Sequence, residues 1–455
     1  MQKTSNMSEQ QHERMLHTPI PKLILSLSAP SVASMLVTVV YNTADTWFVS
    51  QISISASAAV GVVFAIMAII QAVGYGLGMG AGSLISRKLG EKNNTEASKF
   101  AASAFVASFL FGLFVTIVGL SFLKPLLRLL GATETMLPYA CDYAKYILIS
   151  APVMCASFAL NNTLRAEGEA MLSMWGLCIG GILNMVLDPL LIFTAGFGIA
   201  GAGIATAVSQ LVSFVILLCV MQFGKSIIRI SWKNVSHDLS CYYLILSTGF
   251  PTICRQGMSS IASAVLNIQA AQYGDAAVAA VTIANKIYLL IRNIILGIGQ
   301  GLQPVAGYNF GAKDMKRTRE SFRFATIIGT VGCIIAAVLT SIFAAKLIGW
   351  FRDDAEVIRI GRVALLFACA VMPFMAYSTF VNQMYQCLGF KLPATFLASC
   401  RQGVCFLPII LIAPYFLGLL GVQMAQPLAD LCTFFISVPF QIVFFRKHLP
   451  VSESA

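Results

Sequence analysis

The sequence predicts an all-α integral membrane protein of twelve transmembrane helices, built as two six-helix lobes by a parallel internal repeat. Two observations lead to this fold class: long uncharged apolar runs, and a motif pattern that recurs 221 residues later. Hydrophobic residues make up 58% of the 455 residues, charged residues only 11%, and the mean hydropathy is +0.80. An ordinary soluble domain carries about 25% charged residues, so the composition excludes that class.

The apolar runs are long enough to cross a bilayer as helices, for which about 20 residues suffice. They are continuous, unlike the ~10-residue alternating segments of a transmembrane β-barrel. We expect spans at residues 23–49, 57–86, 100–123, 138–160, 171–195, 199–222, 243–270, 277–307, 321–345, 360–387, 394–414 and 419–445. The first twenty residues are polar and hold no apolar core before Lys22, so no cleavable signal peptide is expected.

Prolines and glycines carry the internal repeat. The pairs at an offset of 221 are Pro30 and Pro251, Val60 and Val281, Gly76 and Gly297, Gly78 and Gly299, Gly80 and Gly301, Gly90 and Gly311, Lys92 and Lys313, Pro152 and Pro373, and Gly168 and Gly389. One residue is then lost, and the pairs at 220 are Gly198 and Gly418, Gly201 and Gly421, and Ala205 and Ala425. The chain is one unit written twice, so side chains that differ between the copies indicate where chemistry occurs.

Six spans per copy return the chain to its starting side, so both copies share one orientation about an axis along the membrane normal. The predicted parts are an N-terminal tail at 1–22, an N-lobe at 23–222, a linker at 223–242, a C-lobe at 243–445 and a C-terminal tail at 446–455. Lys and Arg are concentrated in the tails, the linker and the loops on the same side, which places both termini in the cytoplasm. The net charge of +11 reflects this topology, and cations spread over separate short loops do not indicate nucleic-acid binding.

Cysteine and histidine give no sign of a metal or catalytic site. The 12 cysteines form no CxxC pair, and the four histidines lie in termini or loops. An intramembrane enzyme would need a metal-binding acid pair, or a set of Ser, His and Glu side chains, within the spans. The acid pair Asp353 and Asp354 falls in a loop instead. We therefore expect neither an enzyme nor a cofactor.

Two acids fall inside predicted spans of the first copy. Asp45 and Asp188 lie late in the first and fifth spans, which run in the same direction, and Thr206 reaches a similar depth on the returning sixth span. Asn184 shares a helix face with Asp188. We expect these four side chains to form an oxygen-lined site for a coupling H⁺ or Na⁺. The alternatives are that Asp45 caps the outer end of its helix or snorkels to the interface, and that Asp188 hydrogen-bonds at a kink beside Pro189.

The second copy has Leu266 and Ile409 where the first has these acids. Its spans instead carry four bases and one acid: Arg255, Lys286, Arg292, Arg401 and Asp430. Arg255 and Asp430 both fall near mid-membrane by residue count, so we expect them to form an ion pair, because an unpaired buried charge is costly. The alternative is that Asp430 is a second coupling acid.

The glycine-rich stretches and the prolines are interpreted as structural features. The stretches from Gly74 to Gly82 and from Gly297 to Gly301 follow no strand and carry no Lys-Ser/Thr, so they are poor candidates for phosphate loops. Small residues permit close helix packing instead. Pro30 lies in the first span below Asp45, where a kink could act as a hinge.

Several motifs occur in a fixed order: Asn-Thr-Ala-Asp-Thr at 42–46, Gly-Ala-Gly-Ser followed by Arg-Lys-Leu-Gly within 80–90, Leu-Arg-Ala-Glu-Gly at 164–168 and Asn-x-x-x-Asp-Pro at 184–189. With the duplicated six-helix unit, they resemble the multidrug and toxic compound extrusion (MATE) transporters over about residues 20–445. Residues 266–267, 269–274 and 305–311 resemble the bacterial MepA-like branch of that family.

The resemblance implies two lobes around a central cavity, with ion binding that drives alternating access. The ion site of the family's first lobe maps onto Asp45, Asn184, Asp188 and Thr206, and its hinge proline onto Pro30. Some members carry a Glu on the seventh helix and an Asp on the tenth. The seventh span here has Arg255 in that region, and the tenth has no acid within its apolar part. Coupling is therefore expected to rest on the first lobe.

We expect a secondary active multidrug exporter of the bacterial cytoplasmic membrane, coupled to H⁺ or Na⁺ and functional as a monomer. A proton held between two acids and a cationic drug would compete for the same charge, and Phe, Tyr and Met would supply an adaptable wall. We expect Tyr41, Asn42, Lys286 and Arg292 to line the cavity. Bases there would suit a zwitterionic or anionic metabolite.

The alternative function is that of a lipid-linked saccharide flippase of the same superfamily, for which a deep cationic cavity is expected. A major-facilitator transporter would need a charged motif in the loop after the second span. That loop reads Ser-Arg-Lys-Leu-Gly-Glu-Lys-Asn-Asn and lacks it.

Overall fold

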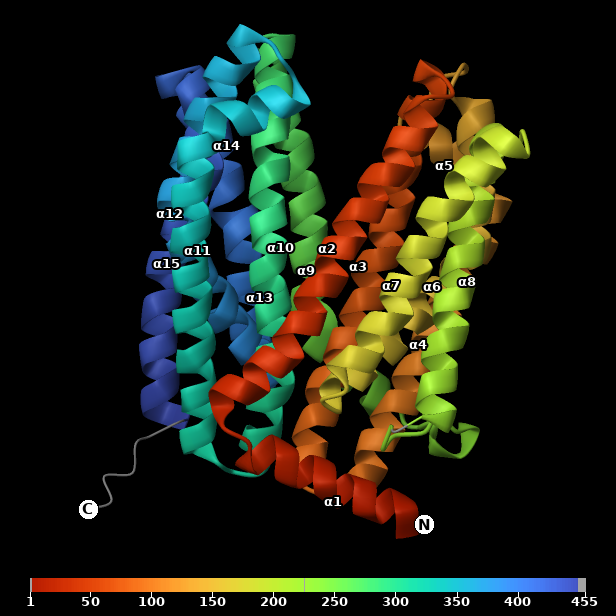
Figure 1. Cartoon of the computed structure of the whole chain (residues 1–455), viewed down its shortest axis with the longest axis vertical. Coiled ribbons are helices and arrows are strands. Elements are labelled where there is room, and N and C mark those ends of the chain that lie inside the picture. The colour runs from red at the N-terminus through yellow and green to blue at the C-terminus, as the bar shows by residue number, and fades with distance from the viewer. Residues whose placement is uncertain (1, 225, 449–455) are drawn as a thin grey trace.

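In the computed structural model, which describes residues 2–224 and 226–448, the chain is helical and those residues contain no strand. The first half comprises α1 Gln2–His17, α2 Ile20–Ser50, α3 Ile54–Gly90, α4 Asn94–Ser121, α5 Leu123–Leu129, α6 Leu137–Ala166, α7 Ala170–Pro189 with a π-helix at Leu190–Thr194, and α8 Gly198–Phe223. The second comprises a 3₁₀ turn at Trp232–Asn234, α9 Leu239–Ala271, α10 Asp275–Gly311, α11 Met315–Phe351, α12 Ala355–Cys387, α13 Lys391–Ser399 with a π-helix at Cys400–Val404, α14 Phe406–Leu417 and α15 Leu419–His448. Figure 1 shows the two halves as separate bundles.

A helix occupies each of the twelve predicted spans, and the predicted all-α fold is confirmed. Eleven helical stretches among the described residues are long and apolar enough to cross a membrane. The exception is α9, where Arg255, Gln256 and several hydroxyl side chains interrupt the apolar sequence. The sequence did not predict α5, or α1 within the tail at 1–22. Of the predicted C-terminal tail, 446–448 end α15, and 449–455 lie outside the described residues.

The repeat is visible in the backbone of two equivalent turns. Lys92, between α3 and α4, has φ 60°, and Lys313, between α10 and α11, has φ 62°. Positive φ is uncommon for residues other than glycine. In both turns the next residue then caps the following helix: a side-chain oxygen of Asn93 accepts from the Glu96 amide, and one of Asp314 accepts from the Arg317 amide. The two copies thus share local geometry as well as sequence.

Several glycines of the repeat lie where the lobes touch. A Cβ on Gly80 of α3 would lie 2.2 Å from the carbonyl oxygen of Ile245 on α9. At the equivalent place in the other copy, a Cβ on Gly301 of α10 would lie 2.2 Å from Ser28 Oγ on α2. Such contacts let helix backbones approach closely. The glycine-rich stretches at 74–82 and 297–301 therefore lie at the contact between the lobes, which we call the seam.

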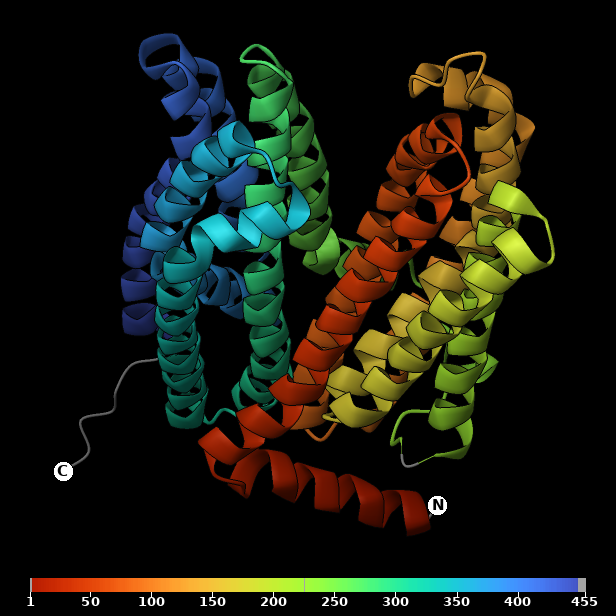
Figure 2. The same cartoon turned by 45° about the horizontal axis from the view of Figure 1, so that its top comes forward.

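The seam lies in the half of the bundle that is nearer both termini. There the ends of α3 and α10 cross, and a Cβ on Gly90 or Gly311 would lie 2.1 Å from the carbonyl oxygen of Tyr308 or Arg87 respectively. The largest buried apolar cluster takes residues from both lobes, whereas a second cluster belongs to the N-lobe alone. Figures 1 and 2 show the two bundles diverging from this end toward the other. The described parts of the lobes therefore pack together at this end.

Glu167, in the loop after α6, anchors the linker. Its buried carboxylate accepts hydrogen bonds from the Ser226 hydroxyl at 2.9 Å and from the Ile227 amide at 2.9 Å. Burial outweighs these hydrogen bonds and raises the pKa of Glu167 to about 8. Further along, the Ser236 amide donates to Ser103 Oγ at 2.9 Å. The described part of the linker is thus packed against the N-lobe.

Candidate functional site

The four residues predicted for ion binding lie together inside the N-lobe. Asp188 is fully buried in the last turn of α7. The amide of Asn184, one turn earlier, donates to Asp188 Oδ1 at 3.3 Å and to Thr206 Oγ1 on α8 at 3.4 Å. Asp45, on α2, packs beside α7 and interacts electrostatically with Asp188. Pro189 ends the regular turns of α7, and the chain continues as a π-helix.

Tyr143, on α6, completes this cluster, and the sequence analysis missed it. Its hydroxyl donates to Asp45 Oδ2 at 3.3 Å, and its side chain is fully buried. Tyr143 also interacts electrostatically with Asp188 and reaches Thr206. The equivalent residue of the second copy, 221 positions on, is Ala364. That difference between the copies was the one available signal.

Three oxygens of the cluster are left without partners. Asp45 Oδ1, Asn184 Oδ1 and Asp188 Oδ2 are buried and accept no hydrogen bond. Buried acceptors that lack a donor cost about 1–3 kcal/mol each, and native proteins rarely retain them. A proton on one of the acids would turn an unpartnered acceptor into a donor, and a Na⁺ among the three oxygens would be a partner for all of them. Among the described residues there is no cluster of three or more His, Cys, Asp and Glu that could hold a metal. An ion here would therefore need the amide and hydroxyl oxygens as well as the two acids.

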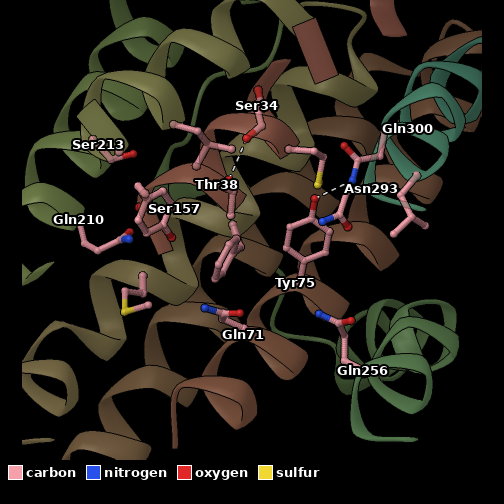
Figure 3. Close-up of a pocket in the computed structure, with 18 of the residues that line it drawn as sticks. Ser34, Thr38, Gln71, Tyr75, Ser157, Gln210, Ser213, Gln256, Asn293 and Gln300 are labelled. Carbon is pink, nitrogen blue, oxygen red and sulfur yellow. Dashed lines mark hydrogen bonds between the residues drawn. The ribbon is translucent and has the colours of Figure 1, made fainter. Parts of the chain in front are cut away.

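A cavity of about 220 Å³ lies between the lobes, next to this cluster. Asn184 and Thr206 form part of its wall, whereas the two acids lie behind them. Figure 3 shows polar side chains around it, among them Gln71 and Tyr75 of α3 and Gln256 of α9.

Two of the four residues predicted to line the cavity do so, and two do not. Tyr41 and Arg292 line the cavity. Asn42 is not among the lining residues, and Lys286 is exposed on another face of α10.

The ion pair predicted between Arg255 and Asp430 is wrong. Asp430 pairs instead with Arg401, whose Nε lies 2.6 Å from Asp430 Oδ1. The Tyr288 hydroxyl donates to Asp430 Oδ2 and accepts from Arg401 Nη2 at 2.8 Å. Residue counting gave the depth of these charges, but it did not give the side of the helix on which each one lies. Asp430 is thereby neutralised within the C-lobe.

Arg255 and Arg292 are left facing the cavity. They are the charged side chains among the residues that line it. Arg292 is 7% exposed, and Arg255 Nε is buried without a hydrogen-bond partner. Among the described residues, no acid lies within ion-pair distance of either guanidinium.

A polar contact between the lobes closes the cavity toward the seam. Arg165, on α6, donates through Nη1 to the Tyr75 hydroxyl at 3.2 Å and to Gln300 Oε1. Gln300, on α10, donates in turn to the Tyr75 hydroxyl at 2.8 Å, as Figure 3 shows. Side chains of both lobes thus form the floor of the cavity.

Comparisons with known proteins agree on one kind of molecule. The sequence matches the MatE family over residues 30–190 and 251–412, once in each lobe. It is 26% identical over 435 residues to a FAD transporter of Shewanella oneidensis, covering 92% of this chain and 93% of that protein. It is 26% identical over 441 residues to the multidrug export protein MepA of Staphylococcus aureus, covering 96% of each. A solved multidrug resistance MATE transporter of the MOP superfamily, in an outward-facing conformation, superposes with a TM-score of 0.90 at 26% identity, covering 95% of this chain and 97% of that one.

Proposed function

Because the chain belongs to the MatE family of membrane transporters, we propose that it is a secondary active exporter that moves small organic compounds by alternating access, against an inward flow of H⁺ or Na⁺. It is a multi-pass membrane protein and not an enzyme. The single observation that carries the coupling proposal is the set of three buried, unpartnered oxygens in the N-lobe. An ion that binds there supplies the missing partners and stabilises the conformation that contains them.

The direction of transport follows from the topology. Both termini are cytoplasmic by the positive-inside rule, so the glycine seam lies on the cytoplasmic side. The cavity then opens outward, in keeping with the similarity to an outward-facing relative. To open inward, the seam must part while α2 moves relative to α10. Pro30 lies in α2 between Ser28 and Val32, the two α2 residues that contact the glycines of α10. We propose it as the hinge.

The relatives suggest two classes of cargo. One relative is the multidrug export protein MepA. Tyr41, Tyr75 and Phe158 give the cavity an aromatic wall, which suits lipophilic organic cations as the first class. The second candidate is export of an anionic metabolite or a lipid-linked anion. It is favoured by the two arginines of the wall and is compatible with a relative that transports FAD.

The coupling proposal is tested in proteoliposomes with pH and Na⁺ gradients imposed separately. We expect efflux of an organic probe, either ethidium or an acidic dye, to follow one of the gradients in the wild type and to be lost in Asp45→Asn. Asp353→Asn is the matched control, because it neutralises an exposed acid in the loop before α12. Full gradient-driven efflux in Asp45→Asn at equal reconstitution would overturn the coupling role. If the wild type moves no ethidium, the same gradients are applied to an acidic probe.

A further inference from the structure

We propose that Arg255 and Arg292 form a binding site for an acidic group of the transported compound. The chemical class is an amphipathic organic anion: a phosphate or carboxylate attached to a flat, lipophilic body. The inference rests on the proposed transport function and names its cargo. Packing does not account for these arginines, since they take no part in the lobe cores or the seam.

The charges around the cavity favour an anion. The neighbouring acid Asp430 is already neutralised by Arg401 and Tyr288. The base beneath the floor, Arg165, bonds to neutral groups. Buried guanidinium groups without counter-ions are costly, so a ligand that brings an anion removes that cost.

The acids of the N-lobe do not neutralise this wall. Asp45 and Asp188 lie behind Asn184 and Thr206 and are not among the residues that line the cavity. They bond to Tyr143 and Asn184 within their own lobe. The cavity therefore presents positive charge on its C-lobe side, while the acids are hidden on the other.

The internal repeat shows that packing does not require the arginines. The residues 221 positions before Arg255 and Arg292 are Ser34 and Gln71, and both line the same cavity from the N-lobe. Uncharged side chains thus fill the equivalent places. The two guanidinium groups are a property of the C-lobe wall alone.

The surroundings suit an acid with an attached ring. A guanidinium binds a phosphate or carboxylate through two parallel hydrogen bonds. Gln256 and Asn293, each next in sequence to an arginine, also line the cavity and can donate to the same group. Tyr41 and Phe158 offer apolar surface for the rest of the molecule.

Equilibrium binding to the purified full chain, without any gradient, tests the site. The probes are 1-pyrenebutyrate, 1-pyrenebutanol and 1-pyrenebutylamine, which share a ring and a linker and differ in charge. We expect the butyrate to bind at least about 10-fold more tightly than the other two, as charge-assisted hydrogen bonds predict. Arg255→Gln and Arg292→Gln should each weaken butyrate binding by about 10- to 100-fold. Lys286→Gln, which removes an exposed base of the same helix as Arg292, should leave it unchanged.

Two further measurements separate a soluble cargo from a lipid-borne one, and loss of binding from loss of the fold. Competition by 1-naphthyl phosphate and by dioctanoyl phosphatidic acid separates a soluble cargo from a lipid-borne one, and no displacement by either would overturn the site. Equal binding of all three pyrenes, or an equal loss in Lys286→Gln, would also overturn it. Thermal unfolding of each variant checks the fold. If butyrate binding does not depend on the arginines but ethidium efflux still depends on Asp45, the anion site is wrong and the coupling proposal stands. If butyrate binding depends on the arginines but efflux does not depend on Asp45, the coupling proposal is wrong and the anion site stands.

A different part of the molecule carries a second inference. Helix α1 lies across the closed end of the bundle, at a steep angle to the other helices (Figures 1 and 2). On the N-lobe side, Gln11 Nε2 donates to the carbonyl oxygen of Glu167 at 2.6 Å, and Met15 is fully buried beside Gly168. These contacts attach α1 to the loop between α6 and α7.

The same helix also contacts the C-lobe. His12 Nδ1 lies 3.3 Å from the Tyr308 hydroxyl at the end of α10. Beyond the end of α1, Arg317 Nη2 of α11 donates to the carbonyl oxygen of Thr18 at 2.7 Å. Tyr308 is itself part of the seam, where its carbonyl approaches Gly90. We infer that α1 is a strap that holds the two lobes together at the seam and must release the C-lobe before that end can open.

Hydrogen exchange of the seam tests the strap. In the double variant His12→Ala with Arg317→Gln, we expect amide exchange in segments 76–90 and 297–311 to rise by about 5-fold or more, because opening becomes easier. Glu13→Ala, on the exposed face of α1, is the control. Unchanged exchange in the double variant, or the same rise in Glu13→Ala, would show that α1 is only attached to the bundle.

Discussion

The two lobes share a fold and a set of glycines, but the charged side chains that they place beside the cavity are opposite in sign. Three acids of the N-lobe, the buried Glu167 and Asp188 and the half-buried Asp45, have aliphatic equivalents in the C-lobe: Leu388, Ile409 and Leu266. The C-lobe places two arginines in the cavity wall where the N-lobe has uncharged residues. The copies thus keep the glycines that pack the helices, whereas these charged positions differ. One lobe could thus take an ion and the other a cargo.

This separation has a mechanistic consequence. When a cationic drug and a proton compete for one carboxylate, binding of either displaces the other. Here an anionic cargo and the coupling cation would occupy different lobes and would not share a charge. Coupling would then act through the conformation of the lobes, by differential binding of each ligand to the two states.

Removal of an N-lobe acid should have the largest effect. Asp188→Asn keeps the shape of the side chain and removes its charge, so we expect ion-driven transport to fall by about 100-fold or more. Binding of 1-pyrenebutyrate should change little, since Arg255 and Arg292 remain. Transport rates under an imposed gradient and equilibrium binding without one measure the two effects. Equal losses of both would contradict the division between the lobes.

Removal of the C-lobe acid should instead damage the fold. Asp430→Asn leaves Arg401 buried with no counter-charge, which costs about 3–5 kcal/mol. The double variant Arg401→Met with Asp430→Leu removes both charges and should recover most of the thermal stability. Thermal unfolding of the purified variants checks this. If Asp430→Asn is stable but loses ion coupling, then Asp430 is a second coupling acid and the lobes are less different than proposed.

The sequence predicted the fold well because hydropathy and the repeat are properties of whole segments. It also brought together Asn184, Asp188 and Thr206, because residue counting gives depth and the i, i+4 spacing gives a shared face. It paired Arg255 with Asp430 wrongly, because the partner is decided by rotation about the helix axis. That rotation depends on packing contacts that a single sequence does not display.

Two further features were missed for related reasons. Tyr143 joins the cluster of Asp45, Asn184, Asp188 and Thr206 only because α6 packs beside α8, and nothing in its own segment marks it. Helix α1 is polar, and its contacts are with both lobes rather than with an apolar core of its own. The two arginines of the cavity wall were visible as charges within spans, whereas their lack of acid partners required the structure.

Loss of the Tyr143 hydroxyl should have a moderate effect confined to the N-lobe. Tyr143→Phe removes the donor to Asp45, and one such hydrogen bond is worth about 1 kcal/mol. We expect the ion concentration for half-maximal transport to change by about 3- to 10-fold, with butyrate binding unaltered. Tyr288→Phe, in the C-lobe, is the matched variant and should leave the ion dependence unchanged. A similar shift in both variants would remove the assignment of Tyr143 to the ion site.

The smallest effect concerns Glu167, whose C-lobe equivalent is Leu388. Its pKa is raised to about 8 in the folded state, against about 4.3 in an unfolded chain. The folded state therefore binds the proton more tightly. The resulting stability is present in full below pH 4.3 and is lost as the pH rises through 8. The loss is at most about 5 kcal/mol. Glu167→Gln cannot titrate, so its melting temperature should fall less than that of the wild type between pH 5 and pH 9.

Glu13→Gln neutralises an exposed acid of α1 and is the control for this difference. Because Asp45 and Asp188 are present in all three proteins, any contribution they make to the pH dependence is shared and cancels. If the wild type and Glu167→Gln lose stability in parallel, the buried carboxylate is not what couples the linker to pH. If only Glu167→Gln is insensitive, Glu167 is the acid that makes the packing of the linker depend on pH, a role that its C-lobe equivalent, Leu388, has no charge to perform.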